Sequence, residues 1–214
     1  GTQMNRNNIW RYNRAYDMTT ASHLFGEGHL IYSNLISYVH CNYLEDGTLF
    51  DGKVAQPFGF DTKPYSDHVS YGNMLINNTF YNVGGVINIQ DKAYTVSNNI
   101  YANNLAINWT SDTAANGAFY DDSVDIQYVM NNGVFSTIGM VDPFVVDNKI
   151  YSAADVNDSV AGYSGNISAD PKFVNADLNN MQHGARLDFT LSAESPMRYA
   201  GLPLYDDIYK TFPM

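Results

Sequence analysis

Short apolar runs that end in asparagine recur along the chain. The clearest pair is NMLINNTFYNV, residues 73–83, and YTVSNNIYANN, residues 94–104, which superimpose without a gap at an offset of 21 residues. Weaker copies begin at Trp10, Ile31 and Val129, and each has an apolar residue three positions before an asparagine. Repetition at a period in this range predicts a solenoid, in which every repeat forms one coil.

The aligned asparagines predict coils of about 21 residues. The intervals between them are 21, 44, 21 and 33 residues, which we interpret as one coil, two coils, one coil, and one coil with an inserted loop. The superposition sets Asn78 on Asn99. The aligned residues are, in chain order, Asn13, Asn34, Asn78, Asn99 and Asn132.

The residues around the asparagines predict the structure of a coil. Valine, isoleucine, phenylalanine and tyrosine predominate there, without the repeated leucines of a leucine-rich repeat, so we expect short β-strands separated by turns. Asparagine tolerates the left-handed backbone of a tight bend. Where it recurs on successive coils, the side-chain amides are expected to hydrogen-bond in a ladder, which offsets the cost of burying them. The expected fold class is therefore all-β, a parallel β-helix.

Composition agrees with this fold and excludes some partners. The 214 residues include 25 asparagines and 17 tyrosines, and only 15% are charged. The formal net charge of -11 disfavours nucleic acid and anionic membrane surfaces as partners. No apolar run approaches the roughly 20 residues of a membrane span. Cys41 is the only cysteine, which excludes an internal disulfide and a cysteine-based zinc cluster.

The predicted organisation is one solenoid with a closing segment. Coils are expected over residues 1–185, with irregular loops at about 44–70 and 110–125. Residues 186–214 are expected to close the solenoid and to pack on it as a C-terminal tail. No amphipathic helix precedes the first coil, so we expect end-to-end contact with another chain or with a preceding part of a longer protein.

Three stretches carry a resemblance to right-handed parallel β-helix proteins of the pectin-lyase-like type. YGNMLINNTFYNVGGVINIQDKAYTVSNNIYANN, residues 71–104, looks like the paired coils of secreted bacterial carbohydrate-active enzymes. NISADPKFVNADL, residues 166–178, and DFTLSAESPMRYAGLPL, residues 188–204, are similar to the segment that closes many such solenoids. The resemblance implies an extracellular or periplasmic protein that binds a polysaccharide or oligosaccharide.

Candidate catalytic carboxylates lie near the first irregular loop. In β-helical glycoside hydrolases with this style of coil an acidic turn precedes the coil, and the resemblance sets Asp61 there, with Thr62 where a second aspartate would stand. Asp67 or Asp91 is the candidate partner, with His68 orienting one of them. Carboxylates on adjacent coils, about 4.8 Å apart, approach the separation of retaining glycosidases, and two coils apart they approach that of inverting ones. The alternative is that Asp61 and Asp67 form turns.

Other side chains are candidates for binding. Aromatic rings beside loops can stack on sugar rings, with core packing as the alternative, and Glu45 is an acidic candidate. An acidic run, Asp121, Asp122 and Asp125, is a weak candidate for calcium, with a solvated loop as the alternative. No other cofactor is expected. The candidate substrate-binding residues are Tyr38, Glu45, Tyr65, Tyr71, Trp109 and Tyr120.

Three functions remain open at this point. A lyase acting on a uronate needs basic residues or calcium, yet no arginine occurs between Arg14 and Arg186. A glycoside hydrolase with paired carboxylates needs no such cluster and is the leading prediction, for a neutral or weakly charged polysaccharide. The alternatives are a polysaccharide lyase and a non-catalytic glycan-binding or structural solenoid, as in adhesins and tail fibres.

Overall fold

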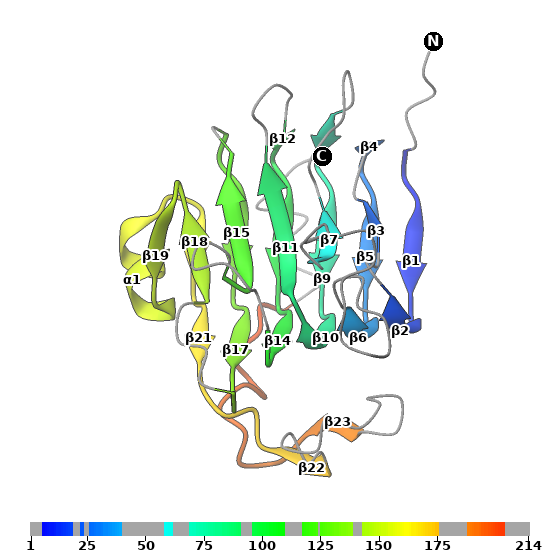
Figure 1. Cartoon of the computed structure of the whole chain (residues 1–214), viewed down its shortest axis with the longest axis vertical. Coiled ribbons are helices and arrows are strands. Elements are labelled where there is room, and N and C mark those ends of the chain that lie inside the picture. Colours follow the sequence, from blue (N-terminus) through cyan, green and yellow to red (C-terminus); the bar gives the residue numbers. More distant parts are fainter. Residues whose placement is uncertain are drawn as a thin grey trace, which may run out of the picture.

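The chain forms a stack of parallel coils (Figure 1). The computed structural model describes residues 6–18, 22–23, 26–39, 58–61, 69–90, 96–109, 117–123, 125–138, 143–175 and 188–203. These residues form 23 strands and one short helix. None of their helices is long and apolar enough to cross a membrane.

Two six-stranded parallel sheets form adjacent sides of the stack. Sheet 1 has the order β1 (Ile9–Arg11), β5 (Leu30–Tyr32), β9 (Met74–Ile76), β13 (Ile100–Ala102), β16 (Tyr128–Met130), β20 (Tyr163–Ser164). Sheet 2 has the order β2 (Arg14–Met18), β6 (Leu35–Val39), β10 (Thr79–Val83), β14 (Leu105–Ile107), β17 (Gly133–Phe135), β21 (Ile167–Ser168).

Two further sheets complete the coils. Sheet 3 has the order β19 (Lys149–Tyr151), β18 (Phe144–Val146), β15 (Phe119–Asp122), β11 (Gly85–Gln90), β7 (Phe58–Asp61), β3 (Ser22–His23), and its β18–β19 pair is antiparallel. Sheet 4 has the order β12 (Val96–Ser97), β8 (Ser70–Tyr71), β4 (Gly26–Glu27). Outside the coils, β22 (Phe173–Asn175) pairs antiparallel with β23 (Asp188–Leu191). The all-β parallel solenoid is therefore confirmed.

The predicted loops contain strands of the stack. β7 lies within the expected 44–70 loop, and β15 lies within the expected 110–125 loop. β7 has Phe58 and Phe60 at alternate positions, and this short period-2 pattern favours a strand despite the polar residues around it, whereas β15 begins with the adjacent aromatic residues Phe119 and Tyr120. The last parallel pairing joins β17 and β21.

A buried asparagine ladder runs through the corner between sheets 1 and 2. The backbone N–H and Nδ2 of Asn104 donate to Asn132 Oδ1 over 2.9 and 3.0 Å. Its own Oδ1 accepts from the backbone N–H and Nδ2 of Asn78, both at 3.0 Å. The same pattern joins, in order, Asn13, Asn34, Asn78, Asn104, Asn132 and Asn166. The predicted ladder is confirmed.

The ladder corrects the predicted alignment of coils. Asn34 donates directly to Asn78 Oδ1, so the 44 residues between them form one coil and not two. Asn78 stacks on Asn104, and the predicted superposition on Asn99 is wrong by five residues. Asn99 belongs to a second ladder at the corner between sheets 4 and 1. The members of this second ladder are His29, Asn73, Asn99 and Gln127.

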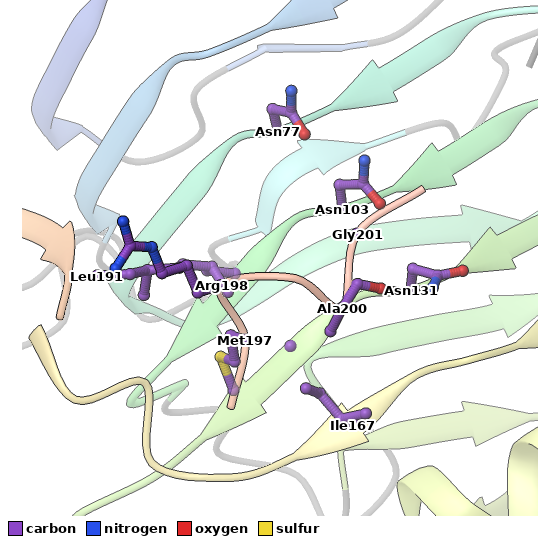
Figure 2. Close-up of a pocket in the computed structure, with 11 residues that line it drawn as sticks. Asn77, Asn103, Asn131, Ile167, Leu191, Met197, Arg198, Ala200 and Gly201 are labelled. Carbon is purple, nitrogen blue, oxygen red and sulfur yellow. Dashed lines mark hydrogen bonds between the residues drawn. The ribbon is translucent and has the colours of Figure 1, made fainter. Parts of the chain in front are cut away.

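The residue with the left-handed backbone conformation and the residue that joins the ladder are two adjacent residues, not the same one. Asn77, Asn103 and Asn131 have positive φ angles of 55°, 57° and 52°, and each immediately precedes a ladder asparagine. Their side chains therefore lie on the outside of the corner between sheets 1 and 2, where they follow one another on successive coils (Figure 2). Residues 197–201 pass beside this outer row.

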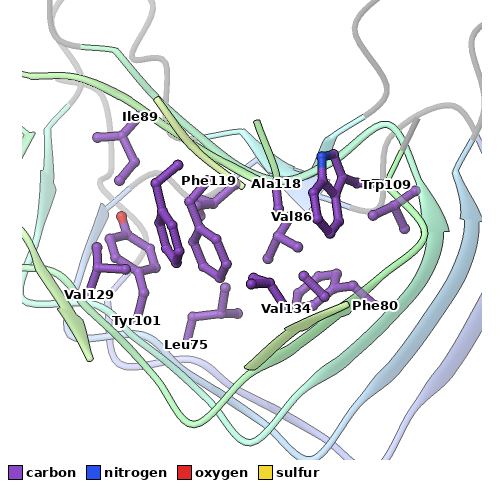
Figure 3. Close-up of a cluster of buried hydrophobic side chains, with 14 of the residues drawn as sticks. Leu75, Phe80, Val86, Ile89, Tyr101, Trp109, Ala118, Phe119, Val129 and Val134 are labelled. Atoms are coloured by element: carbon purple, nitrogen blue, oxygen red, sulfur yellow. The ribbon is translucent and has the colours of Figure 1, made fainter. Parts of the chain in front are cut away.

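The interior of the coils is apolar. Sheets 1, 2 and 3 all contribute to one cluster of buried side chains, which point into the same interior (Figure 3). Phe119 and Phe144 stack there with ring centroids 5.1 Å apart. Full burial of each large apolar side chain stabilises the fold by roughly 1.5 to 3 kcal/mol.

A short helix closes one end of the ladder. α1 (Ala153–Ser159) begins at Ser152, whose Oγ accepts from the backbone N–H of Asp155. Asn157 on this helix accepts the backbone N–H and Nδ2 of Asn166 over 3.1 and 2.9 Å. The last ladder asparagine thus has an acceptor although no further coil follows it in the described stack.

Candidate functional site

Several of the sequence-predicted site residues lie outside the described part of the chain. These are Glu45, Tyr65, Asp67, His68 and Asp91. Asp61 is the last residue of β7 and Tyr38 lies in β6, and for both the structure describes the backbone alone.

The register of sheet 3 brings Asp61 into line with Tyr120, another predicted site residue. Asp61 pairs with Asn88 of β11, and Asn88 pairs with Tyr120 of β15. On its other side Asp61 pairs with His23 of β3. Positions in register across parallel strands share a face of the sheet, so this row runs along the solenoid axis from coil to coil.

Asp122 lies two residues beyond Tyr120 on β15 and therefore occupies the same face as this row. Asp121 pairs with Val146, so Asp122 and Asp147 are the next residues along two paired strands, and Asp147, with a φ angle of 49°, lies in the turn after β18. A hydrogen bond from the Asp147 backbone N–H to the Asp121 carbonyl oxygen, at 3.0 Å, holds this register. We did not predict Asp147, because it lies in an aperiodic stretch where only the FYDD and FVVDN patterns hint at stacked strands.

Asp121 itself points into the protein. Its Oδ1 accepts from the backbone N–H and Oγ of Ser123, and its Oδ2 accepts from the hydroxyl of Tyr163 at 2.9 Å. Burial raises the pKa of the Asp121 carboxyl above its ordinary value, although these hydrogen bonds oppose the shift. Burial also raises the pKa of Tyr163 well above its ordinary value, and the nearby Asp121 adds to this. The pair fixes β20 to β15 inside the stack.

The aromatic residues predicted to stack on sugar rings differ in their exposure to solvent. Tyr71 on β8 is 46% exposed, so its ring is open to solvent. Trp109 is 2% exposed and packs in the main cluster of buried side chains. For this residue the alternative of core packing therefore holds. Tyr120 is 7% exposed and packs against Val145.

The acidic run does not gather into a metal site. The Asp121 carboxylate is engaged by Ser123 and Tyr163, and Asp125 is exposed. Within the described ranges, no three histidine, cysteine, aspartate or glutamate side chains are arranged to hold a metal ion.

A separate hollow lies outside the corner between sheets 1 and 2. Its volume is about 430 Å³; residues 12–14, 33–35, Asn77 and Thr79 of three successive coils form one wall, and β23 forms the other. Tyr12 at its edge is 69% exposed, and the Arg11 guanidinium lies 5.6 Å from the centre of the Tyr12 ring. The sequence contains no signal for this hollow, because its walls are more than 100 residues apart in the chain. The principal lining residues are Tyr12, Arg14, Asn77, Thr79, Asp188 and Thr190.

Comparison of the chain with protein-family models, with curated proteins and with solved structures finds no match in any of the three.

Proposed function

We propose that this solenoid is of the pectin-lyase-like type and hydrolyses a neutral or weakly charged polysaccharide outside the cytoplasm. The observation that carries the proposal is the register of sheet 3, with three aspartate positions, Asp61, Asp122 and Asp147, on neighbouring coils. Glycoside hydrolysis needs two carboxyl groups on opposite sides of the scissile bond, one of which donates a proton to the leaving oxygen.

Two pairings of these aspartates predict different stereochemistry. Asp122 and Asp147 are one coil apart, about 4.8 Å between backbones, which approaches the roughly 5 to 5.5 Å of a retaining pair. Asp61 and Asp122 are two coils apart and offset by two residues, roughly 12 Å between their Cα atoms. Side chains that lean toward each other from that distance would reach the roughly 6.5 to 9.5 Å of an inverting pair. Asp122 is common to both arrangements.

The test is a screen on neutral plant and algal oligosaccharides. Asp122→Asn is expected to lower kcat by roughly 10²- to 10⁴-fold, as for loss of an acid or base. The anomer released first, followed by NMR, distinguishes the pairings: retention implicates Asp147, and inversion implicates Asp61. Asp158→Asn, an exposed aspartate on α1, is the matched control and should retain full activity.

Three results would decide against this proposal. Hydrolysis that is unchanged in Asp61→Asn, Asp122→Asn and Asp147→Asn would exclude these groups. Binding of an oligosaccharide without turnover would favour the alternative of a non-catalytic glycan-binding solenoid, and β-elimination products would favour a lyase.

A further inference from the structure

The outer row of asparagines already binds one peptide backbone. Asn103 Nδ2 donates to the Leu202 carbonyl oxygen at 3.0 Å, and Asn103 Oδ1 accepts the Leu202 backbone N–H at 2.8 Å. One coil further on, Asn131 Nδ2 donates to the Ala200 carbonyl oxygen at 2.6 Å. Each asparagine thus contacts main-chain atoms, and Ala200 and Leu202, on either side of a bend at Gly201, reach successive coils.

The fit of this segment depends on close approach to the coils. A Cβ added at Gly201 would lie 3.2 Å from the Asn103 amide, and one added at Gly133 would lie 2.7 Å from Met197 Sδ. Met197 is buried by this contact. Recognition here therefore rests on backbone atoms and on small residues rather than on charged side chains.

Asn77 is the next member of the same row. It has the same positive φ angle, and its backbone N–H donates to the Ala102 carbonyl oxygen just as that of Asn103 donates to Met130. Among the described residues its side-chain amide makes no hydrogen bond, and it lines both the 430 Å³ hollow and a smaller one of about 220 Å³ beside residues 197–201. Figure 2 shows Asn77 further along the row than Asn103, beside which the described part of the segment lies.

We propose that Asn77 and the hollow beside it bind an extended peptide through its backbone. The Asn77 amide would accept the N–H and donate to the C=O of one peptide residue, as Asn103 does with Leu202. Side chains of that peptide would lie between Tyr12 and Phe189, which form apolar parts of the two walls. Arg14 and Asp188, also in the lining, place one charge of each sign in the hollow.

The probe is a fluorescein-labelled peptide with the sequence of residues 197–203, Met-Arg-Tyr-Ala-Gly-Leu-Pro, followed by fluorescence polarisation with the full chain. This sequence is chosen because its backbone already fits the row at Asn103. Asn77→Gly keeps the left-handed turn and removes the amide. Loss of two hydrogen bonds is expected to weaken binding roughly tenfold to a hundredfold.

Asn98→Gly is the matched control. Asn98 has the same φ angle of 55° and is exposed, but it belongs to the corner between sheets 4 and 1. This variant should bind the peptide as the wild type does, and circular dichroism should show both variants folded. A second probe carries an N-methyl group on the leucine amide, which removes the donor that Asn77 would accept, and should bind as weakly as Asn77→Gly binds the parent peptide.

Three results would overturn the inference. They are no saturable binding of the peptide to the wild-type chain, equal binding by Asn77→Gly and wild type, and no effect of the N-methyl group. Binding of a neutral oligosaccharide that Asn77→Gly abolishes, without peptide binding, would assign the hollow to a glycan instead. None of these results depends on Asp122, so the inference and the proposed hydrolysis fail separately.

Discussion

Removal of one amide from the middle of the ladder tests what holds the coils in register. In Asn104→Ala the backbone N–H of Asn78 loses its only acceptor in the ladder, and the Leu75 carbonyl oxygen loses a donor at 2.8 Å. Asn132 Oδ1 keeps the backbone N–H of residue 104, and Asn78 Nδ2 keeps two carbonyl partners. Two buried polar groups are therefore left poorly satisfied, at about 1 to 3 kcal/mol each. The expected loss of unfolding free energy is about 2 to 5 kcal/mol.

Asn13→Ala provides the matched comparison at the end of the same ladder. Its Nδ2 donates to Asn34 Oδ1 and to the Arg11 carbonyl oxygen, and the Asn34 oxygen keeps the backbone N–H of residue 13. This site is partly exposed, so water replaces the lost partners and the expected loss is about 0.5 to 1.5 kcal/mol. Urea unfolding followed by tryptophan fluorescence measures both values. By this reasoning the stack is stabilised because the amide gives hydrogen-bond partners to buried polar groups. Equal losses of unfolding free energy in the two variants would refute it.

Three further changes have defined outcomes. Burial raises the pKa of Asp121, so the folded state still holds the proton at a pH where the unfolded state has released it. The stability of the wild type therefore falls as pH rises from the ordinary pKa of 3.8 through the raised one. Asp121→Asn should gain stability relative to the wild type between pH 4 and pH 7 in urea titrations, and a difference that is constant with pH would contradict this. Tyr163→Phe removes a hydrogen bond from that buried carboxylate and should lose about 1 to 3 kcal/mol at pH 7, measured in the same way, whereas no loss would show that water reaches Asp121. Gly162 has a φ angle of 86°, and a Cβ added there would collide with the Gln127 carbonyl oxygen, so Gly162→Ala should lower the melting temperature more than Gly72→Ala, where an added Cβ meets nothing within 4 Å. A larger decrease in Gly72→Ala would contradict the collision.

Much of the fold follows from local sequence. Apolar β-branched and aromatic residues around asparagine predict short strands and tight bends, because both preferences act within a few residues. The ladder also follows, because a buried amide needs partners and only a stacked copy can supply both a donor and an acceptor. These arguments correctly predict an all-β parallel solenoid, and the buried Asn78, Asn104 and Asn132 confirm the ladder.

The alignment of coils does not follow from the sequence. Each coil carries two corners five residues apart, as at Asn73 and Asn78 or at Asn99 and Asn104, and a turn residue precedes each of these. The local pattern therefore matches itself after a shift of five residues, which is why the ungapped superposition pairs Asn78 with Asn99. The shift is resolved only by which strands pair in sheets 1 and 2.

The sequence by itself determined the strand content, the recurrent turns and the need for a ladder, since these depend on residue type and close neighbours. The tertiary structure alone decided which coils are adjacent, and with that the register of Asp122 against the turn at Asp147 and the placement of Asn77 next to Asn103. Those pairs are 25 and 26 residues apart in the chain. Their contact depends on the lengths of the intervening turns, which vary from coil to coil and carry no periodic signal.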